Sequence, residues 1–211
     1  MIAIIDYKAG NLVSVERAVR ALGFGCQITR DPGRIKTAER VIFPGVGAAG
    51  SAMADLKRTG LDKVLKSVFK KGTPLLGICL GTQIILEFSD EDGGTECLGL
   101  LPGKVERFPA NMSEAGQRLK VPHMGWNRIS FVRDHPVFSG LDPEYEFYFV
   151  HSYFPAPSQD RHVIALTDYG LSFASIVAQD NLAAVQFHLE KSGRPGLKIL
   201  KNFCEWDGKD A

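Results

Sequence analysis

One cysteine of this chain lies in a glycine-flanked turn between two apolar segments. Residues 74–86 read PLLGICLGTQIIL, so an apolar run stops at Gly77-Ile78-Cys79-Leu80-Gly81 and continues as an apolar segment of helical character. The same pattern with serine is the nucleophile elbow, in which glycines permit the sharp strand-to-helix turn that exposes the central side chain. Free N–H groups at a helix start favour the reactive thiolate. The stretch predicts a nucleophilic Cys79; a small buried cysteine beside two packing glycines is the alternative.

A histidine and a carboxylate two residues apart supply a candidate base. The run Gln186-Phe187-His188-Leu189-Glu190 comes at the end of a strand-like segment. Residues two apart in extended chain point to the same side, so the pattern predicts that Glu190 orients the His188 imidazole. With Cys79 they form a candidate triad, because triads assemble in space and not in sequence.

The other four histidines lack a carboxylate at that spacing in a strand context; they are His123, His135, His151 and His162. Each is therefore a weaker candidate for the base. His151, in the run Val150-His151-Ser152-Tyr153, is a further candidate for the lining of the same crevice.

A glycine-rich loop precedes the cysteine turn. The run Gly45-Val46-Gly47-Ala48-Ala49-Gly50 matches the dinucleotide fingerprint, but it does not follow the first strand, and Lys70 stands where that fingerprint needs an acidic residue. In an open parallel sheet, loops at the carboxyl ends of neighbouring strands share one crevice. The loop is therefore expected to face Cys79, and its N–H groups to meet that of Leu80 around a developing oxyanion. A turn needed only for chain reversal is the alternative.

The first half of the chain alternates short apolar runs with helix-compatible segments, which is typical of β-α units on a mostly parallel sheet. The predicted strands run from Ile2 to Ile5, Cys26 to Thr29, Arg40 to Phe43 and Leu75 to Ile78, and the predicted helices from Asn11 to Leu22 and Leu61 to Phe69. The second half predicts an antiparallel or mixed extension. Its predicted strands run from Lys104 to Phe108, Arg128 to Val132, Glu146 to Val150, Val163 to Thr167 and Leu182 to Gln186, before a closing helix from Gly196 to Phe203.

The composition is typical of an ordinary globular protein. The 211 residues are 45% hydrophobic and 23% charged, without a linker-like segment, so a single domain spanning residues 1–211 is expected. The formal net charge of +1 favours neither nucleic acid nor a membrane surface as a partner. The chain has no signal peptide and no apolar run of about 18 residues, which predicts a cytoplasmic location. The four cysteines lack metal-ligand spacing and predict reduced thiols, with neither metal nor cofactor.

These features together resemble the class I, or triad, glutamine amidotransferases. Further blocks resemble one branch, the glutaminase subunits of imidazole glycerol phosphate synthase. The blocks are Asp6-Tyr7-Lys8-Ala9-Gly10-Asn11-Leu12, Pro44-Gly45-Val46-Gly47, Val121-Pro122-His123-Met124-Gly125-Trp126-Asn127 and Tyr148-Phe149-Val150-His151-Ser152-Tyr153. The resemblance extends from Asp6 to Ser192 in the family's order. It implies an α/β fold of the class I glutamine amidotransferase type, flavodoxin-like, with a mostly parallel central sheet flanked by helices and a β-rich extension in the second half.

The resemblance also implies an activity and a partner. A member of this branch hydrolyses glutamine to glutamate and ammonia, and passes the ammonia to a separate (β/α)8 cyclase subunit in a heterodimer of histidine biosynthesis. The implied catalytic residues are Cys79 as nucleophile, His188 as acid and base, and Glu190 as its orienting carboxylate. The remaining implied residues are Val46 or Gly47 with Leu80 as oxyanion donors, Gln83, Glu91 and the Ser152-Tyr153 backbone for glutamine, and Asn11, Met124, Trp126 and Lys191 toward the cyclase.

The chain departs from the family's pattern at three positions. Leu189 replaces the usual proline between the histidine and the glutamate, which forfeits the fixed φ of proline. Thr82 stands where methionine is common, and Ala49 where phenylalanine is frequent. None of these removes a reacting group. Two alternatives stay open: a glutaminase subunit that feeds a different synthase, for instance in surface-sugar biosynthesis, and a non-catalytic amidotransferase-like scaffold.

Overall fold

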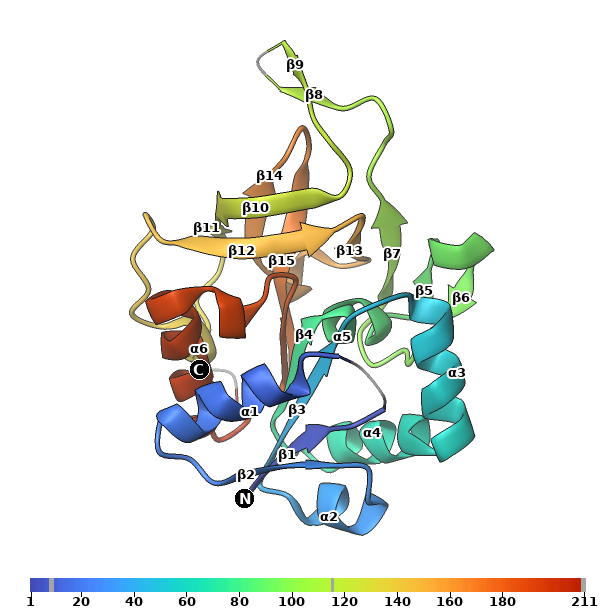
Figure 1. Ribbon diagram of the computed structural model, residues 1–211, viewed down its shortest axis with the longest axis vertical. Coiled ribbons are helices and arrows are strands. Elements are labelled where there is room, and N and C mark those ends of the chain that lie inside the picture. Colours follow the sequence, from blue (N-terminus) through green and yellow to red (C-terminus); the bar gives the residue numbers. More distant parts are fainter. Residues whose placement is uncertain (8–9, 115, 210–211) are drawn as a thin grey trace.

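A central sheet organises the protein, which a computed structural model describes for residues 1–7, 10–114 and 116–209 (Figure 1). Its strands are β1 (Ile2–Ile5), β2 (Cys26–Thr29), β3 (Arg40–Gly45), β4 (Leu75–Cys79), β11 (Ser130–Phe131), β14 (Val163–Asp168), β15 (Ser172–Gln179) and β16 (Leu182–Val185). They lie in the order β11-β14-β15-β16-β4-β3-β1-β2. The pairs from β16 to β2 are parallel, and those from β11 to β16 are antiparallel. The carboxyl ends of β3, β4 and β16 therefore meet at one edge.

Apolar residues alternate between the two faces of the sheet, and each face is covered by helices. Ile2 and Ile4 of β1 pack with α1 (Leu12–Ala21) and α6 (Gly193–Glu205). Ala3 and Ile5 pack on the opposite face, against helices that lie on the other side of the sheet in Figure 1; these are α2 (Pro32–Thr37), α3 (Ala49–Thr59) and α4 (Leu61–Lys70). This two-sided burial explains why the parallel strands read as continuous apolar runs.

The chain after residue 87 also builds smaller β elements outside the central sheet (Figure 1). An antiparallel ribbon pairs β10 (His123–Arg128) with β12 (Glu146–His151). A four-stranded sheet contains β13 (Tyr153–Pro157), β7 (Gly103–Arg107), β5 (Phe88–Ser89) and β6 (Thr95–Glu96), and β8 (Ser113–Glu114) forms a hairpin with β9 (Gln117–Arg118). The short helical turns are α5 (Leu80–Ile84), η1 (Glu91–Gly93), η2 (Pro136–Phe138), η3 (Asp160–His162) and η4 (Leu189–Lys191).

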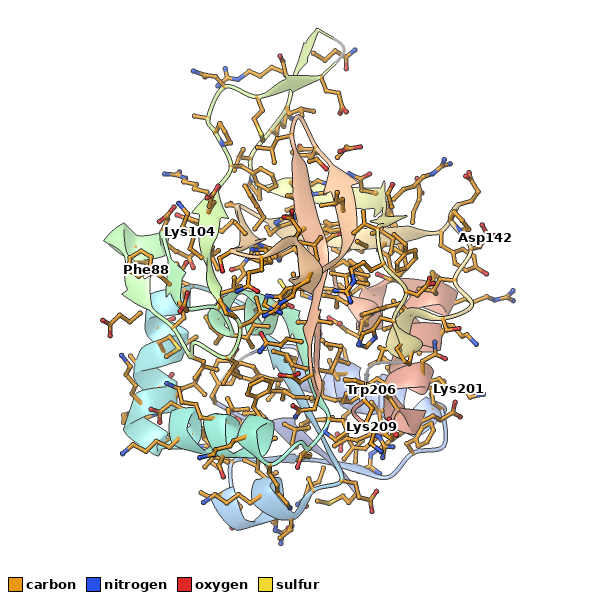
Figure 2. The ribbon with its side chains drawn as sticks, turned by 180° about the vertical axis from the view of Figure 1, so that it is seen from behind. Phe88, Lys104, Asp142, Lys201, Trp206 and Lys209 are labelled. Atoms are coloured by element: carbon orange, nitrogen blue, oxygen red, sulfur yellow. The ribbon has the colours of Figure 1, made fainter. Side chains whose placement is uncertain are left out.

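The segment after α6 folds back onto the start of β3. The Arg40 guanidinium donates two hydrogen bonds to the Trp206 carbonyl, at 3.0 and 2.7 Å, and the Trp206 indole donates to the Lys209 carbonyl at 2.7 Å. Trp206 and Lys209 lie near each other below α6 in the view from behind (Figure 2). These contacts fix the far edge of the sheet, away from the carboxyl ends of its parallel strands.

The predicted fold class is confirmed, with local corrections. The single strand expected from Arg128 to Val132 is wrong, because the chain leaves β10 at Arg128 and joins a different sheet as β11. Two helices, α2 and α3, were not expected; α3 follows the glycine-rich loop and buries only a narrow face, Ala49, Ala52, Met53 and Leu56. Among the described residues, no helix is long and apolar enough to span a bilayer.

Candidate active site

The backbone turns sharply at Cys79, between β4 and α5. Cys79 has φ 54° and ψ −110°, a region that L-residues rarely adopt and that a functional constraint commonly imposes. A Cβ on Gly81 would lie 1.9 Å from the Phe43 carbonyl oxygen, and one on Gly77 would lie 3.0 Å from the Ala184 Cβ. Gly81 is therefore required by the close packing of the turn against β3, and Gly77 packs tightly against β16. The predicted elbow has the geometry that displays its central side chain.

We expect Gly81→Ala to destabilise the protein by at least about 3 kcal/mol, because the clash is with backbone and forces β3 and the elbow apart. The free energy of unfolding in urea measures this effect. Gly25→Ala is the matched control: a Cβ at Gly25 meets nothing within 4 Å, so that variant should stay within about 0.5 kcal/mol of the parent. Equal stabilities of the two variants would contradict the packing argument.

His188 and Glu190 lie together, but not in the extended geometry that their spacing predicts. That expectation is wrong because the chain after His188 coils into the 3₁₀ turn η4, which contains both Leu189 and Glu190. The turn still brings Nδ1 of His188 to 2.7 Å from Oε1 of Glu190, with both side chains almost fully buried. Because a carboxylate can only accept, Nδ1 carries the proton and Nε2 is left for another partner.

Cys79 lines the same cavity as His188, and its sulfur acts on the imidazole. Burial acts to lower the pKa of His188, but hydrogen bonds from the imidazole to the Cys79 sulfur and to the Glu190 carboxylate, with the charges of both groups, outweigh it and raise the pKa to about 9. The imidazole therefore holds its proton at neutral pH. The three residues form a continuous Cys79–His188–Glu190 arrangement that can exchange a proton between sulfur and nitrogen.

Two residues outside the triad fix its histidine and its carboxylate. The Asn11 side-chain amide donates to the same Glu190 oxygen that His188 uses, while Oε2 of Glu190 accepts no hydrogen bond from the described residues. Asn11 begins α1 in a left-handed conformation, φ 70°. The Ser192 hydroxyl donates to the His188 carbonyl at 2.6 Å and accepts from the Tyr148 N–H at 3.0 Å. Lys8 and Ala9, from the same sequence block as Asn11, lie outside the described residues.

A cavity of about 330 Å³ opens beside Cys79, at the small end of the range for ligand pockets. It brings together every residue expected to bind glutamine or to stabilise its oxyanion. Its lining consists of Val46, Gly47, Cys79, Leu80, Gln83, Glu91, Pro122, Val150, His151, Ser152, Tyr153 and His188. The loop after β3 therefore faces the elbow as topology predicted, and His151 lines the crevice as expected.

The cavity wall presents backbone donors next to the sulfur. No hydrogen bond within the described residues uses the N–H of Val46 or Gly47. Leu80 is the first residue of α5, so its N–H has no partner within the helix. These groups can donate to an oxyanion that forms on a carbon attached to Cys79.

Side-chain amides support the opposite wall. Nε2 of Gln83 donates to the Tyr153 carbonyl at 2.8 Å and to Oε1 of Gln186 at 3.1 Å. Nε2 of Gln186 in turn lies 3.9 Å from the Cys79 sulfur. Sequence reasoning missed Gln186; its signal was a polar residue at the end of an apolar strand. Glu91 accepts from the Ala49 N–H at 2.6 Å, and burial raises its pKa, with an opposing contribution from that bond.

The residues expected to face a partner subunit divide into two groups. Met124 and Trp126 are 61% and 54% exposed on β10, and Lys191 is exposed with its amine 5.5 Å from the centre of the Tyr148 ring. Asn11 differs, because its amide is engaged with Glu190 in the site. The exposed members lie on β10 and η4, on either side of β12.

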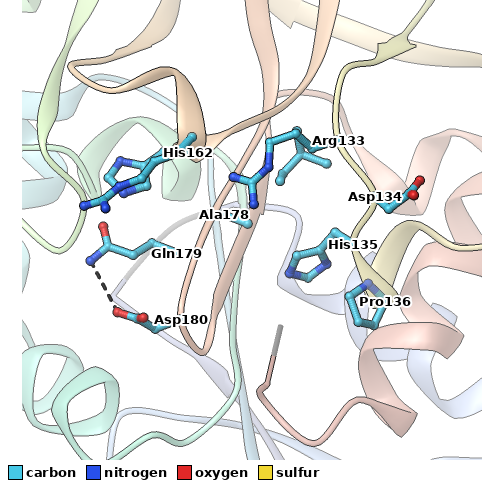
Figure 3. A pocket seen from close by; sticks show the side chains of 10 residues that line it. Arg133, Asp134, His135, Pro136, His162, Ala178, Gln179 and Asp180 are labelled. Carbon is cyan, nitrogen blue, oxygen red and sulfur yellow. Dashed lines mark hydrogen bonds between the residues drawn. The ribbon is translucent and has the colours of Figure 1, made fainter. Parts of the chain in front are cut away.

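A second cavity, of about 350 Å³, lies at the opposite end of β15 from the elbow (Figure 3). Figure 3 shows Arg133, His135 and His162 around it. Nε2 of Gln179 donates a hydrogen bond to Oδ2 of Asp180 at 3.4 Å. Its lining contains no cysteine and none of the residues expected in the site. The cavity at Cys79 is therefore the candidate active site.

Comparisons with known proteins agree with this geometry. Residues 3–206 match the family model described as glutamine amidotransferase class-I. An imidazole glycerol phosphate synthase subunit HisH from Nitratidesulfovibrio vulgaris (strain DP4) is 55% identical over 204 residues, 96% of this chain and 95% of the relative. The HisH protein of Pseudomonas syringae pv. syringae (strain B728a) is 44% identical over 209 residues, 99% and 98% of the two chains. A crystal structure of a glutamine amidotransferase has the same fold, with a TM-score of 0.73 at 18% identity and coverage of 97% and 100%. The chain belongs to the class-I glutamine amidotransferase family and, within it, to the HisH subunits of imidazole glycerol phosphate synthase.

Proposed function

We propose that this chain hydrolyses glutamine to glutamate and ammonia and delivers the ammonia to a (β/α)8 cyclase subunit that makes imidazole glycerol phosphate in histidine biosynthesis. The observation that carries the proposal is Cys79 in a strained turn, at the wall of the same cavity as His188, whose imidazole is bonded to the buried Glu190 carboxylate. The family membership supplies the reaction class. Residues 1–211 act as one glutaminase domain in this proposal.

The proposed reaction starts from the state in which His188 already holds the proton given up by the Cys79 thiol. The Cys79 sulfur attacks the side-chain amide carbon of glutamine, and the oxyanion of the tetrahedral intermediate accepts hydrogen bonds from Leu80 and from the Val46 or Gly47 N–H. His188 then protonates the departing ammonia, which leaves a γ-glutamyl thioester on the sulfur. Water, deprotonated by the same imidazole, hydrolyses the thioester to glutamate and regenerates the thiol. Each oxyanion donor contributes roughly 3 kcal/mol of barrier reduction.

The cavity wall opposite the sulfur binds the amino-acid end of glutamine in this proposal. The Phe108 N–H donates to the Ser152 carbonyl at 3.1 Å. In an antiparallel ladder this bond means that Arg107 and Tyr153, which face each other on β7 and β13, exchange no hydrogen bond. The Tyr153 N–H is therefore not used by the ladder and can donate to the α-carboxylate. Glu91 offers a carboxylate to the α-amino group, and the Gln83 side chain holds the Tyr153 carbonyl in place.

An exposed apolar face supports the proposed heterodimer. Met124 and Trp126 on β10, with Val13 on α1 at 52% exposure, are large apolar side chains in contact with solvent. Large exposed apolar side chains of this kind are typical of protein interfaces. Val46 is 39% exposed and lines the cavity, so the rim of the candidate active site also presents an apolar side chain to solvent. We place the heterodimer in the cytoplasm, whose reducing conditions suit the four free thiols.

Glutamine hydrolysis measured with and without the cyclase subunit tests the proposed function. We expect low turnover for the chain alone and strong activation by the cyclase with its ligand, because unrestrained hydrolysis would waste glutamine. Trp126→Ala should weaken cyclase binding by about 10- to 100-fold, whereas Val132→Ala, which removes an exposed side chain elsewhere, should not. Equal turnover with and without the cyclase would overturn the proposed coupling, and activation only by another synthase would favour the surface-sugar alternative. An absence of turnover under all conditions would favour the scaffold.

The pH profile of kcat/KM should fall on its alkaline side near pH 9, where His188 loses the proton that the departing ammonia needs. The Glu190 carboxylate raises the pKa of His188, so Glu190→Gln should move this limb to lower pH and reduce the maximal rate. The profile of glutamine hydrolysis in the complex measures the shift. Glu146→Gln, on an exposed strand end, is the control and should leave the limb in place. A limb that stays near pH 9 in Glu190→Gln would show that the carboxylate does not act on His188.

A further inference from the structure

Two buried histidines face each other across the β10–β12 ribbon, behind the cavity wall. His123 and His151 are directly paired in the ribbon, and Nδ1 of His123 lies 3.0 Å from Nε2 of His151. The rings are 3% and 5% exposed. His151 lines the cavity and His123 does not, so the pair extends inward from the site. Neither residue takes part in the proposed chemistry.

The hydrogen-bond partners fix which nitrogen of each ring carries the proton. Nδ1 of His151 lies 2.8 Å from the Tyr153 carbonyl, which can only accept, so His151 is protonated at Nδ1. In a neutral ring Nε2 must then accept, and it does so from Nδ1–H of His123. Nε2 of His123 is thereby an acceptor as well. The Tyr153 carbonyl therefore fixes the tautomers of both His151 and His123.

The hydrogen bonds of Asn127, at the other end of the His123–His151 pair, agree with this assignment of donors and acceptors. The Asn127 side-chain oxygen accepts from the Arg128 N–H at 2.8 Å, which orients the amide. Its nitrogen then has two hydrogens, one for the Asp168 carbonyl at 3.0 Å and one for Nε2 of His123 at 3.3 Å. Every bond from Asn127 to Tyr153 therefore points the same way, toward the cavity.

The surroundings keep both rings uncharged. His123 stacks on Phe149 and Tyr169, with ring centres 4.9 and 4.0 Å apart, and Phe108 and Phe173 also contact the pair. Desolvation in this aromatic environment lowers the pKa of His123 to about 4. For His151 burial likewise lowers the pKa, to about 3, against the opposing Tyr153 bond, and the positive charge of His188 also lowers it. Protonation of His151 would also place its Nε2–H against Nδ1–H of His123 at 3.0 Å, and protonation of His123 would place its Nε2–H against the Asn127 amide hydrogen, with the nitrogens 3.3 Å apart.

We propose that Asn127, His123 and His151 form a neutral, one-directional hydrogen-bond chain that holds the Tyr153 carbonyl, which fixes the Tyr153–Phe154 peptide and thereby positions the adjoining Tyr153 N–H that receives the α-carboxylate of glutamine. The proposal rests on the proposed function and makes these side chains positioning residues for substrate binding. The Tyr153 carbonyl accepts twice, from His151 and from Gln83 at 2.8 Å. The peptide before Tyr153 is held separately, because its Ser152 carbonyl accepts from the Phe108 N–H at 3.1 Å. With the carbonyls on both sides of Tyr153 held, its N–H keeps one orientation in the cavity wall, which lowers the ordering cost of glutamine binding.

Nitrogen NMR of the unmodified protein tests this series of hydrogen bonds directly. We expect His123 and His151, assigned with His→Gln variants, to remain neutral from pH 5.5 to 8 and to carry their protons on Nδ1, the less common tautomer of free imidazole. His188 in the same spectra should stay protonated over this range, and serves as an internal comparison. Either ring titrating in that range, or protonated at Nε2, would overturn the proposal.

Kinetics in the complex with the cyclase subunit test the positioning role. His151→Leu should raise KM for glutamine at least about tenfold, since a buried acceptor loses one of its two donors and the His123 Nδ1–H loses its acceptor, while kcat and the alkylation rate of Cys79 by iodoacetamide stay within about threefold. His151→Asn keeps a donor at the place of Nδ1 and should recover most of the loss. His162→Asn, at a buried histidine away from the cavity, should not change KM.

Distinct results separate this inference from the proposed function. If His151→Leu lowers kcat and Cys79 alkylation together, or leaves KM unchanged, the positioning role is wrong. If the unmodified complex does not hydrolyse glutamine, the proposed function fails, and the tautomers measured by NMR still decide whether the hydrogen-bond chain exists. A variant that does not fold leaves the NMR measurement on the unmodified chain as the deciding result.

Discussion

Replacing Cys79 by alanine is expected to abolish glutamine hydrolysis while leaving the cyclase reaction fed by free ammonia intact. The sulfur is the attacking atom in the proposed mechanism, and no other described group in the cavity lining is a thiol. Loss of a triad nucleophile costs at least about 10⁴-fold in kcat, because the remaining oxyanion donors cannot replace covalent attack. The measurement is glutamate release by the complex, compared with product formation at saturating ammonium.

The other three cysteines provide matched controls for this experiment. Burial raises the pKa of the Cys97 thiol to about 11 and that of Cys204 to about 12, and it also raises the pKa of Cys26. These thiols are poor nucleophiles near neutral pH. Cys97→Ala should therefore keep full activity, and a diazoketone analogue of glutamine should label Cys79 alone. Glutamine turnover that survives Cys79→Ala would remove the nucleophile from the proposed mechanism, and labelling of Cys97 in its place would do the same.

The second large effect is expected from His188→Gln. The amide approximates the size of the imidazole but cannot take the thiol proton or give it to the departing ammonia. We expect kcat to fall by about 10³- to 10⁴-fold, and alkylation of Cys79 by iodoacetamide to slow, because the sulfur loses the base that deprotonates it. Steady-state hydrolysis and the rate of alkylation measure the two effects separately.

His162→Gln is the control for this variant, since His162 is buried but lies at the other cavity. It should alter neither rate. Thermal unfolding of both variants distinguishes a chemical loss from a folding defect. A His188→Gln protein that is folded and hydrolyses glutamine at the parent rate would show that another group acts as the base.

The position of both residues follows from the topology of the sheet. Gly45 of β3 is in register with Cys79 of β4, and Val185 of β16 is in register with Ile78, so the oxyanion loop, the nucleophile and the histidine leave the sheet at the same edge. The Thr82 hydroxyl donates to the Val185 carbonyl at 2.5 Å and ties the elbow to the strand that leads to His188. Thr82 therefore contributes a contact that methionine could not make.

Strands with a continuous apolar sequence could be predicted well. Ile2–Ile5 and Cys26–Thr29 have the predicted bounds, because each is a short run of strand-forming residues bounded by a charged residue or glycine. Prediction was poorer where burial is one-sided or the chain changes sheets. The helix α3 was missed because glycine, serine and alanine dominate its first turn, and its burial depends on packing against α4, α5, β6 and η1. The break at Ile129 depends on pairing with β14, which no local pattern encodes.

The sequence by itself determined the reacting groups: a thiol between two glycines, and an imidazole with a carboxylate two residues away. Local chemistry suffices there, since glycine at an elbow and carboxylate beside imidazole are short-range requirements. Tertiary structure alone decided what holds these groups in place. The Asn11 amide reaches Glu190 across 179 positions of sequence, and Gln83 reaches Tyr153 across 70. Such bonds depend on strand order and register, which arise from burying the whole core, so residue types and spacing could not reveal them.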